Sequence, residues 1–281
     1  MPQRPGDLLV GLDLGGTNIK GGLVFVDGQL LRSGSMPLPR EHAERTPEAV
    51  ANLLTSLGQE LLDLEGLAWS DVSAVGVASP GQVIRDTGTV VAASSFPGWK
   101  DVPLAELIYE HTQRPVALCN DANAAAAAEA WTGFGKGQPG ASIVVLTLGT
   151  GVGMGFVQGG RVMPGARGLV EGGHMIVDPA PGARPCPCGQ TGCLEAYASA
   201  SAVTAMTAEL LAEGTPHSPP RSTGGSGHTT HADAASGPSC PSPAAPVAAA
   251  AAADAPAASG GGSTRAARGG GGEGAEIGLD R

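Results

Sequence analysis

Short apolar runs, separated by glycine and polar residues, mark the start of the chain. Leu8–Leu14 and Ile19–Val26 are β-type runs, and an Asp-Gly pair at 27–28 leads into a third run at 28–36. The residues between the first two runs are those of a tight turn: Gly15, Gly16, Thr17 and Asn18. Runs of this length bounded by such turns predict an antiparallel meander.

The spacing of apolar positions then changes to that of amphipathic helices. Thr46 followed by Pro47 is typical of a helix start, with Thr as N-cap and Pro at the first helical position. The predicted inward stripe is Val50, Leu53, Leu54, Leu57 and Leu61. A second helix is predicted from Pro103, with Leu104, Leu107 and Ile108 facing inward.

Two further strands are predicted at Val72–Ala78 and Pro115–Cys119, and an alanine-rich helix runs from the second of them to Trp131. Asp121 therefore lies where a strand ends and a helix begins. A carboxylate there is favoured by the helix dipole and faces the crevice at the strand ends, which is a common place for function. A plain N-cap aspartate explains the same residue equally well.

The pattern of a glycine-rich turn between two strands occurs a second time. Ser142–Leu148 is expected to be a buried strand, and the chain resumes as a strand at Met154–Val157 after a turn that contains Gly149, Thr150 and Gly151. A strand after this turn argues against a dinucleotide fingerprint, which must open a helix. Each turn alone is no more than a plain turn. Two of them, with Asp13 placed to organise hydrated Mg²⁺, suit a triphosphate held from both sides.

A compact group of metal-ligand residues follows. Cys186, Cys188 and Cys193, with His174 upstream, are the residue set of a Cys₃His zinc site. Four protein ligands close the coordination sphere, which favours a structural Zn²⁺ over a catalytic one. The alternative is three reduced cysteines in a loop.

Composition limits the partners. The formal net charge of −10 and the lack of a basic run argue against nucleic-acid binding. We expect no membrane span, because no stretch of about 18 apolar residues occurs, and the start lacks a secretory signal pattern. A cytoplasmic protein is expected, and the clustered, odd-numbered cysteines fit a reducing compartment.

Several motifs occur together and in order. They are DLGGTNIK (13–20), ASPG (78–81), FPGW (96–99), NDAN (120–123), LTLGTGVG (146–153), EGGHM (171–175) and CPCGQTGCLEAYAS (186–199). Over about residues 7–213 the chain resembles the ROK family of sugar kinases, whose members include bacterial glucokinases, within the actin-like ATPase superfamily. The resemblance implies an α/β, actin-like (ribonuclease H-like) fold with two lobes that close on a cleft.

The implied reaction is transfer of the γ-phosphate of ATP, with Mg²⁺, to a hexose hydroxyl. Glucose is the first expectation, and N-acetylmannosamine, N-acetylglucosamine or fructose are the alternatives. The resemblance makes Asp121 the general base and gives sugar contacts to Asn120, Glu171, His174 and Glu195, with Gly81 lining the site. It assigns the nucleotide to Asp13, Gly15, Gly16, Thr17, Asn18, Lys20, Gly149, Thr150 and Gly151. One nitrogen of His174 would bind zinc while the other contacts substrate.

The resemblance has departures. Ser95 stands where many members have Asn, which puts one sugar contact in doubt. The segment 215–281 has only Val247, Ile277 and Leu279 as large aliphatic residues, and it is predicted to be a low-complexity, disordered tail. We therefore expect an N-terminal lobe over 1–118, a partial and incomplete C-terminal lobe with the zinc loop over 119–214, and a tail that is truncated, frameshifted or wrongly spliced.

Three further expectations concern activity, class and assembly. The alternative function is a catalytically impaired relative that still binds sugar, because the second lobe is incomplete. The family's transcriptional repressors carry a helix-turn-helix ahead of the kinase-like part, and a first strand at Leu8 argues against that class. Members are often dimers or tetramers, so a homodimer or homotetramer is implied.

Overall fold

The computed structural model describes residues 7–165 and 170–214, so the predicted tail lies outside the described residues. Its largest sheet has five strands in the order β3-β2-β1-β4-β7. The predicted meander is confirmed, since β1–β2 and β2–β3 pair antiparallel, while β4 pairs parallel to both β1 and β7. The strands are β1 (Leu8–Leu14), β2 (Asn18–Phe25), β3 (Leu30–Pro37), β4 (Val72–Ser79) and β7 (Val116–Asn120).

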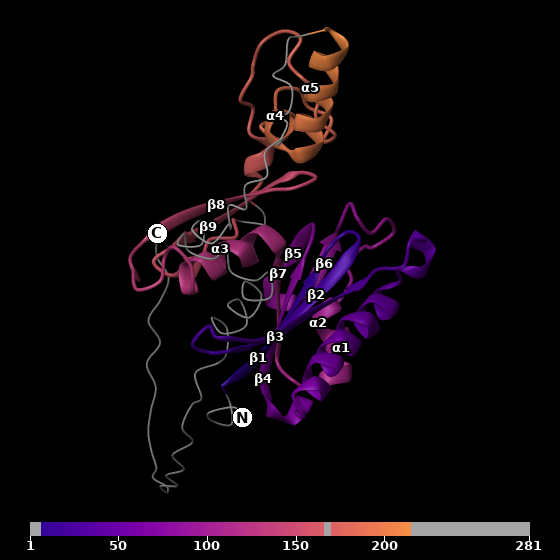
Figure 1. The fold of residues 1–281 in the computed structure, drawn as a ribbon, viewed down its shortest axis with the longest axis vertical. Helices are drawn as coiled ribbons and strands as arrows, with labels where there is room; N and C mark the ends of the chain where they lie inside the picture. Colours follow the sequence, from indigo (N-terminus) through magenta and orange to yellow (C-terminus); the bar gives the residue numbers. More distant parts are fainter. Residues whose placement is uncertain (1–6, 166–169, 215–281) are drawn as a thin grey trace, which may run out of the picture.

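Helices α1 (Pro47–Leu64) and α2 (Leu104–Thr112) pack together on one face of this sheet (Figure 1). Thr46 caps α1 as predicted, with its side chain accepting a hydrogen bond from the Ala49 N–H at 3.2 Å. The predicted stripe is buried apart from Leu53, which is half-buried. Together with the facing residues of β1 and β4, it forms the main apolar core.

The opposite face of the sheet has a smaller core. Leu9, Val24 and Ala74 are buried there, and Trp131 at the end of α3 (Asp121–Trp131) packs against them. Successive residues of β1 point to opposite faces, so Leu8, Val10 and Leu12 join the main core while Leu9 joins this one. The strand is therefore apolar at nearly every position because both its faces are covered.

The other face of α3 packs on a second sheet, in the order β10-β9-β8. Its strands are antiparallel: β8 (Ser142–Leu148), β9 (Val152–Gln158) and β10 (Arg161–Val162). A Cβ on Gly155 would lie 2.3 Å from the Ala122 carbonyl oxygen. The glycines of β9 and the alanines of α3 thus allow the close approach of helix and sheet.

The expectation that Ser142–Leu148 is a buried strand is wrong. Alternate residues of β8 are exposed: Val144 is 58 %, Leu146 47 % and Leu148 65 % exposed. Helix α3 covers one face of β8, and nothing among the described residues covers the other. A run of apolar residues does not reveal by itself whether both faces of a strand find partners.

The remaining elements, apart from α5, are short. They are β5 (Gln82–Ile84), β6 (Thr89–Ala92), the 3-10 helices η1 (His42–Glu44), η2 (Trp69–Asp71), η3 (Arg85–Thr87) and η4 (Gly172–His174), and the helices α4 (Glu195–Ala198) and α5 (Ala200–Ala212). Helices α4 and α5 follow one another directly but are separate. Ser199 separates them because its extended backbone lets its hydroxyl cap α5 through the Ala202 N–H at 3.1 Å.

Candidate functional site

A cavity of about 1010 Å³ lies where the two sheets and the cysteine loop meet. Both glycine hairpins, the β7–α3 junction and the loop before the cysteines contribute to its lining. The predicted site residues on its wall are Asp13, Gly15, Gly16, Gly81, Asn120, Asp121, Gly149, Thr150, Gly151, Glu171, His174 and Glu195. Tertiary folding therefore brings most of the predicted site together from distant parts of the sequence.

The first hairpin is closed by a backbone hydrogen bond across its turn. The Gly15 N–H donates to the Asn18 carbonyl at 3.1 Å, and a Cβ on Gly15 would lie 2.7 Å from that oxygen. Three residues predicted to contact the nucleotide, Thr17, Asn18 and Lys20, are exposed and do not line the cavity. Only the glycine half of this hairpin faces the site.

The second hairpin is fixed by the segment that follows the cysteines. Its Gly149 carbonyl accepts from the Ala200 N–H at 2.8 Å, and its Thr150 carbonyl accepts from the Ser201 hydroxyl at 3.1 Å. The Val152 N–H donates to Glu195 Oε2 at 2.9 Å. Glu195, which the family resemblance assigns to sugar binding, therefore also holds this hairpin in place.

The junction of β7 and α3 rules out the interpretation of Asp121 as a plain N-cap. The N-cap of α3 is Asn120, whose side-chain oxygen accepts from the N–H groups of Ala122 and Asn123 at 3.0 and 3.2 Å. The Asn120 amide donates to the Gly81 carbonyl at 3.1 Å. Asp121 is the first residue of the helix, so its carboxylate is not needed as the N-cap, and it lines the cavity.

The two aspartates of the cavity, Asp13 and Asp121, both have a raised pKa. Burial raises the pKa of Asp13 to about 6; Lys20 opposes this rise and the charge of Asp121 adds to it. Asp121 is reached by water but largely surrounded by protein, and this desolvation raises its pKa, partly offset by hydrogen bonds from Ala122 and Asn120. A divalent cation relieves such desolvated, mutually repelling carboxylates, so Asp13 fits a Mg²⁺ site.

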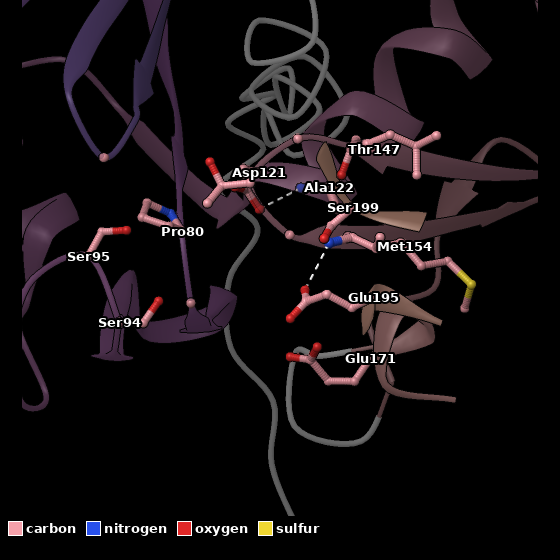
Figure 2. Close-up of a pocket in the computed structure, with 18 of the residues that line it drawn as sticks. Pro80, Ser94, Ser95, Asp121, Ala122, Thr147, Met154, Glu171, Glu195 and Ser199 are labelled. Carbon is pink, nitrogen blue, oxygen red and sulfur yellow. Dashed lines mark hydrogen bonds between the residues drawn. The ribbon is translucent and has the colours of Figure 1, made fainter. Parts of the chain in front are cut away.

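Polar groups face one another across the cavity (Figure 2). Ser94 and Ser95 stand on one wall with Pro80, and Glu171 and Glu195 stand on the other. Nothing in the sequence around Ser94 indicates that it belongs to the site. The adjacent Ser95 is notable only because many members of the resembled family have Asn there. Carboxylates and hydroxyls on opposite walls are groups that can grip the ring hydroxyls of a sugar from two sides.

The cysteine loop fits the predicted zinc site. The ligand atoms of His174, Cys186, Cys188 and Cys193 lie within 4.8 Å of one another. The His174 Nδ1 to Cys186 Sγ distance is 3.6 Å and the Cys188 to Cys193 Sγ distance is 3.7 Å. A tetrahedron with zinc bonds of about 2.0–2.3 Å has edges of about 3.5–3.8 Å. Two of the six donor pairs therefore already have the spacing of a tetrahedral zinc centre, and all four donors lie close enough to meet at one ion.

Histidine 174 joins this cluster to the cavity. Its Nδ1 faces Cys186, and its Nε2 lies 3.8 Å from Glu171 Oε2 on the cavity side. The loop is braced from outside, because the Arg184 guanidinium makes two hydrogen bonds of 2.8 Å to Glu209 of α5. The Tyr197 hydroxyl also donates to Asp178 at 2.6 Å and accepts from the Arg184 N–H at 3.0 Å. The cysteine–histidine cluster and the cavity wall thus form one connected unit.

Within residues 7–165 and 170–214, no helix is long and apolar enough to cross a lipid bilayer. The expected cytoplasmic location, the homo-oligomeric state and the division into lobes at 118/119 stay predictions.

Comparison with known proteins identifies relatives over most of the chain. A glucokinase of Halalkalibacterium halodurans is 37 % identical over 205 residues, which cover 73 % of this chain and 60 % of that protein. An N-acetylmannosamine kinase of Shigella flexneri is 34 % identical over 207 residues, which cover 73 % of this chain and 65 % of that protein. The chain spans about three fifths of the length of its curated glucokinase relatives.

Solved structures are similar in fold. The ROK family glucokinase from Streptomyces griseus, in complex with glucose and AMPPNP, aligns with a TM-score of 0.60 at 34 % identity, covering 74 % of this chain and 62 % of that one. The ROK hexokinase from Thermus thermophilus aligns with a TM-score of 0.59 at 37 % sequence identity. The alignment covers 74 % of this chain and 70 % of that one. These similarities confirm the predicted actin-like α/β fold. The model of the ROK family matches residues 9–244, and the chain belongs to this family.

Proposed function

We propose that this chain transfers the γ-phosphate of ATP to a hexose hydroxyl, with Asp121 as the general base. The observation that carries the proposal is the position of Asp121, on the cavity wall shared by both glycine hairpins and the acidic residues Glu171 and Glu195. Its raised pKa brings a carboxylate closer to the neutral range, where a general base works best.

The hairpins suit the phosphate chain. Gly15 and Gly16 on one side, and Gly149, Thr150 and Gly151 on the other, expose backbone to the same cavity. Backbone N–H groups that converge on an anion are a common way to bind phosphates. Magnesium, when bound at Asp13, would neutralise charge on the β- and γ-phosphates. The Streptomyces griseus relative is in complex with both glucose and AMPPNP, which supports a site that takes a sugar and a nucleotide together.

The sugar is held by the remaining wall. Glu171, Glu195 and His174 would accept from or donate to ring hydroxyls, opposite Ser94 and Ser95, and so orient one hydroxyl toward Asp121. Zinc on His174 Nδ1 would leave Nε2 for substrate and would fix the tautomer of the ring. Glucose is the proposed substrate because the relatives include glucokinases. N-acetylhexosamines are the alternative because the relatives also include N-acetylmannosamine kinases.

The test is ADP release over a panel of glucose, fructose, N-acetylmannosamine and N-acetylglucosamine. Asp121→Asn should lower kcat about a hundred- to ten-thousandfold while sugar binding persists, because the base is lost and the sugar contacts remain. Asp86→Asn, an exposed aspartate outside the cavity, is the matched control. Equal turnover of Asp121→Asn and wild type would refute the assignment.

A second candidate is a sugar-binding relative without phosphoryl transfer. It is favoured by one observation: the outer face of β8 is exposed in the described part of a chain that spans about three fifths of its curated relatives. Sugar binding measured by calorimetry, without ADP release from any sugar of the panel, would support this candidate over the kinase.

A further inference from the structure

The side chain of Arg45 joins three segments of the chain, one of which is the first glycine hairpin. Arg45 Nε donates to the Pro39 carbonyl at 2.8 Å, and its Nη1 donates to the Gly16 carbonyl at 3.0 Å. The same Nη1 makes a longer contact of 3.5 Å with the Ser95 carbonyl. All three acceptors are backbone oxygens, so the role of Arg45 does not depend on the side chains at those positions.

Arg45 itself is fixed at both ends. The backbone N–H of Arg45 donates to the His42 carbonyl at 3.1 Å, and the next residue, Thr46, is the N-cap of α1. Its carbonyl accepts from the Trp99 indole N–H at 2.9 Å. Its guanidinium lies 6.0 Å from the centre of the Phe96 ring, and that ring is 1 % exposed. The side chain is therefore held by a rigid helix start and by the buried part of the loop 93–99.

The two segments joined by Nη1 belong to different halves of the cavity wall. Gly16 is on the hairpin proposed to hold phosphates, and Ser94 and Ser95 are on the wall proposed to hold the sugar. These segments already touch closely, since a Cβ on Gly16 would lie 3.3 Å from Ser95 Oγ. A movement of either segment would change the gap between the phosphate side and the sugar side.

We infer that Arg45 is a positioning residue that clamps the first glycine hairpin against the loop 93–99 and so sets the approach of the phosphoryl donor to the sugar. As a statement about the reaction, this rests on the proposed function. A guanidinium suits the role because its planar fork reaches several carbonyls at once, which a lysine ammonium on a flexible stem cannot reproduce. Arg45 is not a cavity-lining residue, so it acts through the backbone it holds.

The test compares Arg45→Met and Arg45→Lys with the control Arg32→Met in the full chain. Arg32 also bridges two elements, pairing β3 with Glu65 after α1, but away from the cavity. Amide hydrogen exchange is measured over 13–18 and 93–99. Arg45→Met should make exchange about tenfold faster in both segments. Arg45→Lys should accelerate it less, and Arg32→Met should leave exchange in both segments unchanged.

Kinetics provide the second measurement. In Arg45→Met, kcat should fall about a hundredfold, because small displacements between reacting groups are costly, while the zinc content equals that of wild type. Unchanged exchange in either segment, or faster exchange with wild-type kcat, overturns the inference. If wild type releases no ADP with any sugar, the proposed function fails, and the exchange comparison still supports or overturns the clamp itself.

Discussion

Asp13→Asn should make the protein more stable and less active. The pKa of Asp13 is raised from 3.8 to about 6, mainly by burial, so ionising it in the folded protein costs about 3 kcal/mol more than in the unfolded chain. Asparagine has nearly the same shape and does not ionise. We therefore expect Asp13→Asn to raise the free energy of unfolding by about 3 kcal/mol at pH 8 without added magnesium, which corresponds to about 6–12 °C in Tm.

The effect should depend on pH with a definite sign. Between pH 4 and 6 the folded protein binds more protons at Asp13 than the unfolded chain, so the contribution of Asp13 to the stability of the wild type falls as the pH rises through this window. The gap between Asp13→Asn and wild type should thus be about 3 kcal/mol at pH 8 and about half of that at pH 5.

Urea unfolding followed by tryptophan emission measures this gap, since Trp99, which belongs to the same core as residues of β1, is only 7 % exposed. The same variant should lose at least about a hundredfold in phosphoryl transfer, because Asp13 is the proposed Mg²⁺ ligand. Asp86→Asn is the control and should show neither effect. A variant no more stable than wild type at pH 8, or a gap that does not change with pH, would refute the reasoning.

Three other changes test separate parts of the site. Cys188→Ser should abolish bound zinc measured by elemental analysis after zinc loading and dialysis, whereas Cys119→Ser, outside the cluster, should retain it; zinc retained by Cys188→Ser would contradict the assignment. Ser199→Ala should lower the free energy of unfolding by about 1 kcal/mol in urea titrations, because α5 loses its N-cap, and an unchanged midpoint would argue against that cap. Gly151→Ala should raise the sugar KM about tenfold, because its Cβ would lie 2.5 Å from Glu195 Oε2 and displace that carboxylate; a wild-type KM would show that Glu195 does not contact the sugar.

The local features of this protein could be predicted from the sequence. The β1–β2 hairpin, the capped start of α1 at Thr46 and the ligand set of the cysteine loop all depend on residues close together in the chain. Turn chemistry, capping and ligand spacing act over a few residues, so a short window contains the information that determines them.

Other features depend on contacts between distant segments, which a sequence window does not contain. Only the tertiary structure decided that the described residues leave one face of β8 uncovered, that the Thr17 half of the first hairpin turns away from the cavity, and that Ser94 faces Glu171 across it. Glu195 was predicted as a sugar contact, but its bond to the Val152 N–H spans 43 residues. Arg45 had no local signal, because its role comes from three carbonyl groups that meet only when the chain has folded.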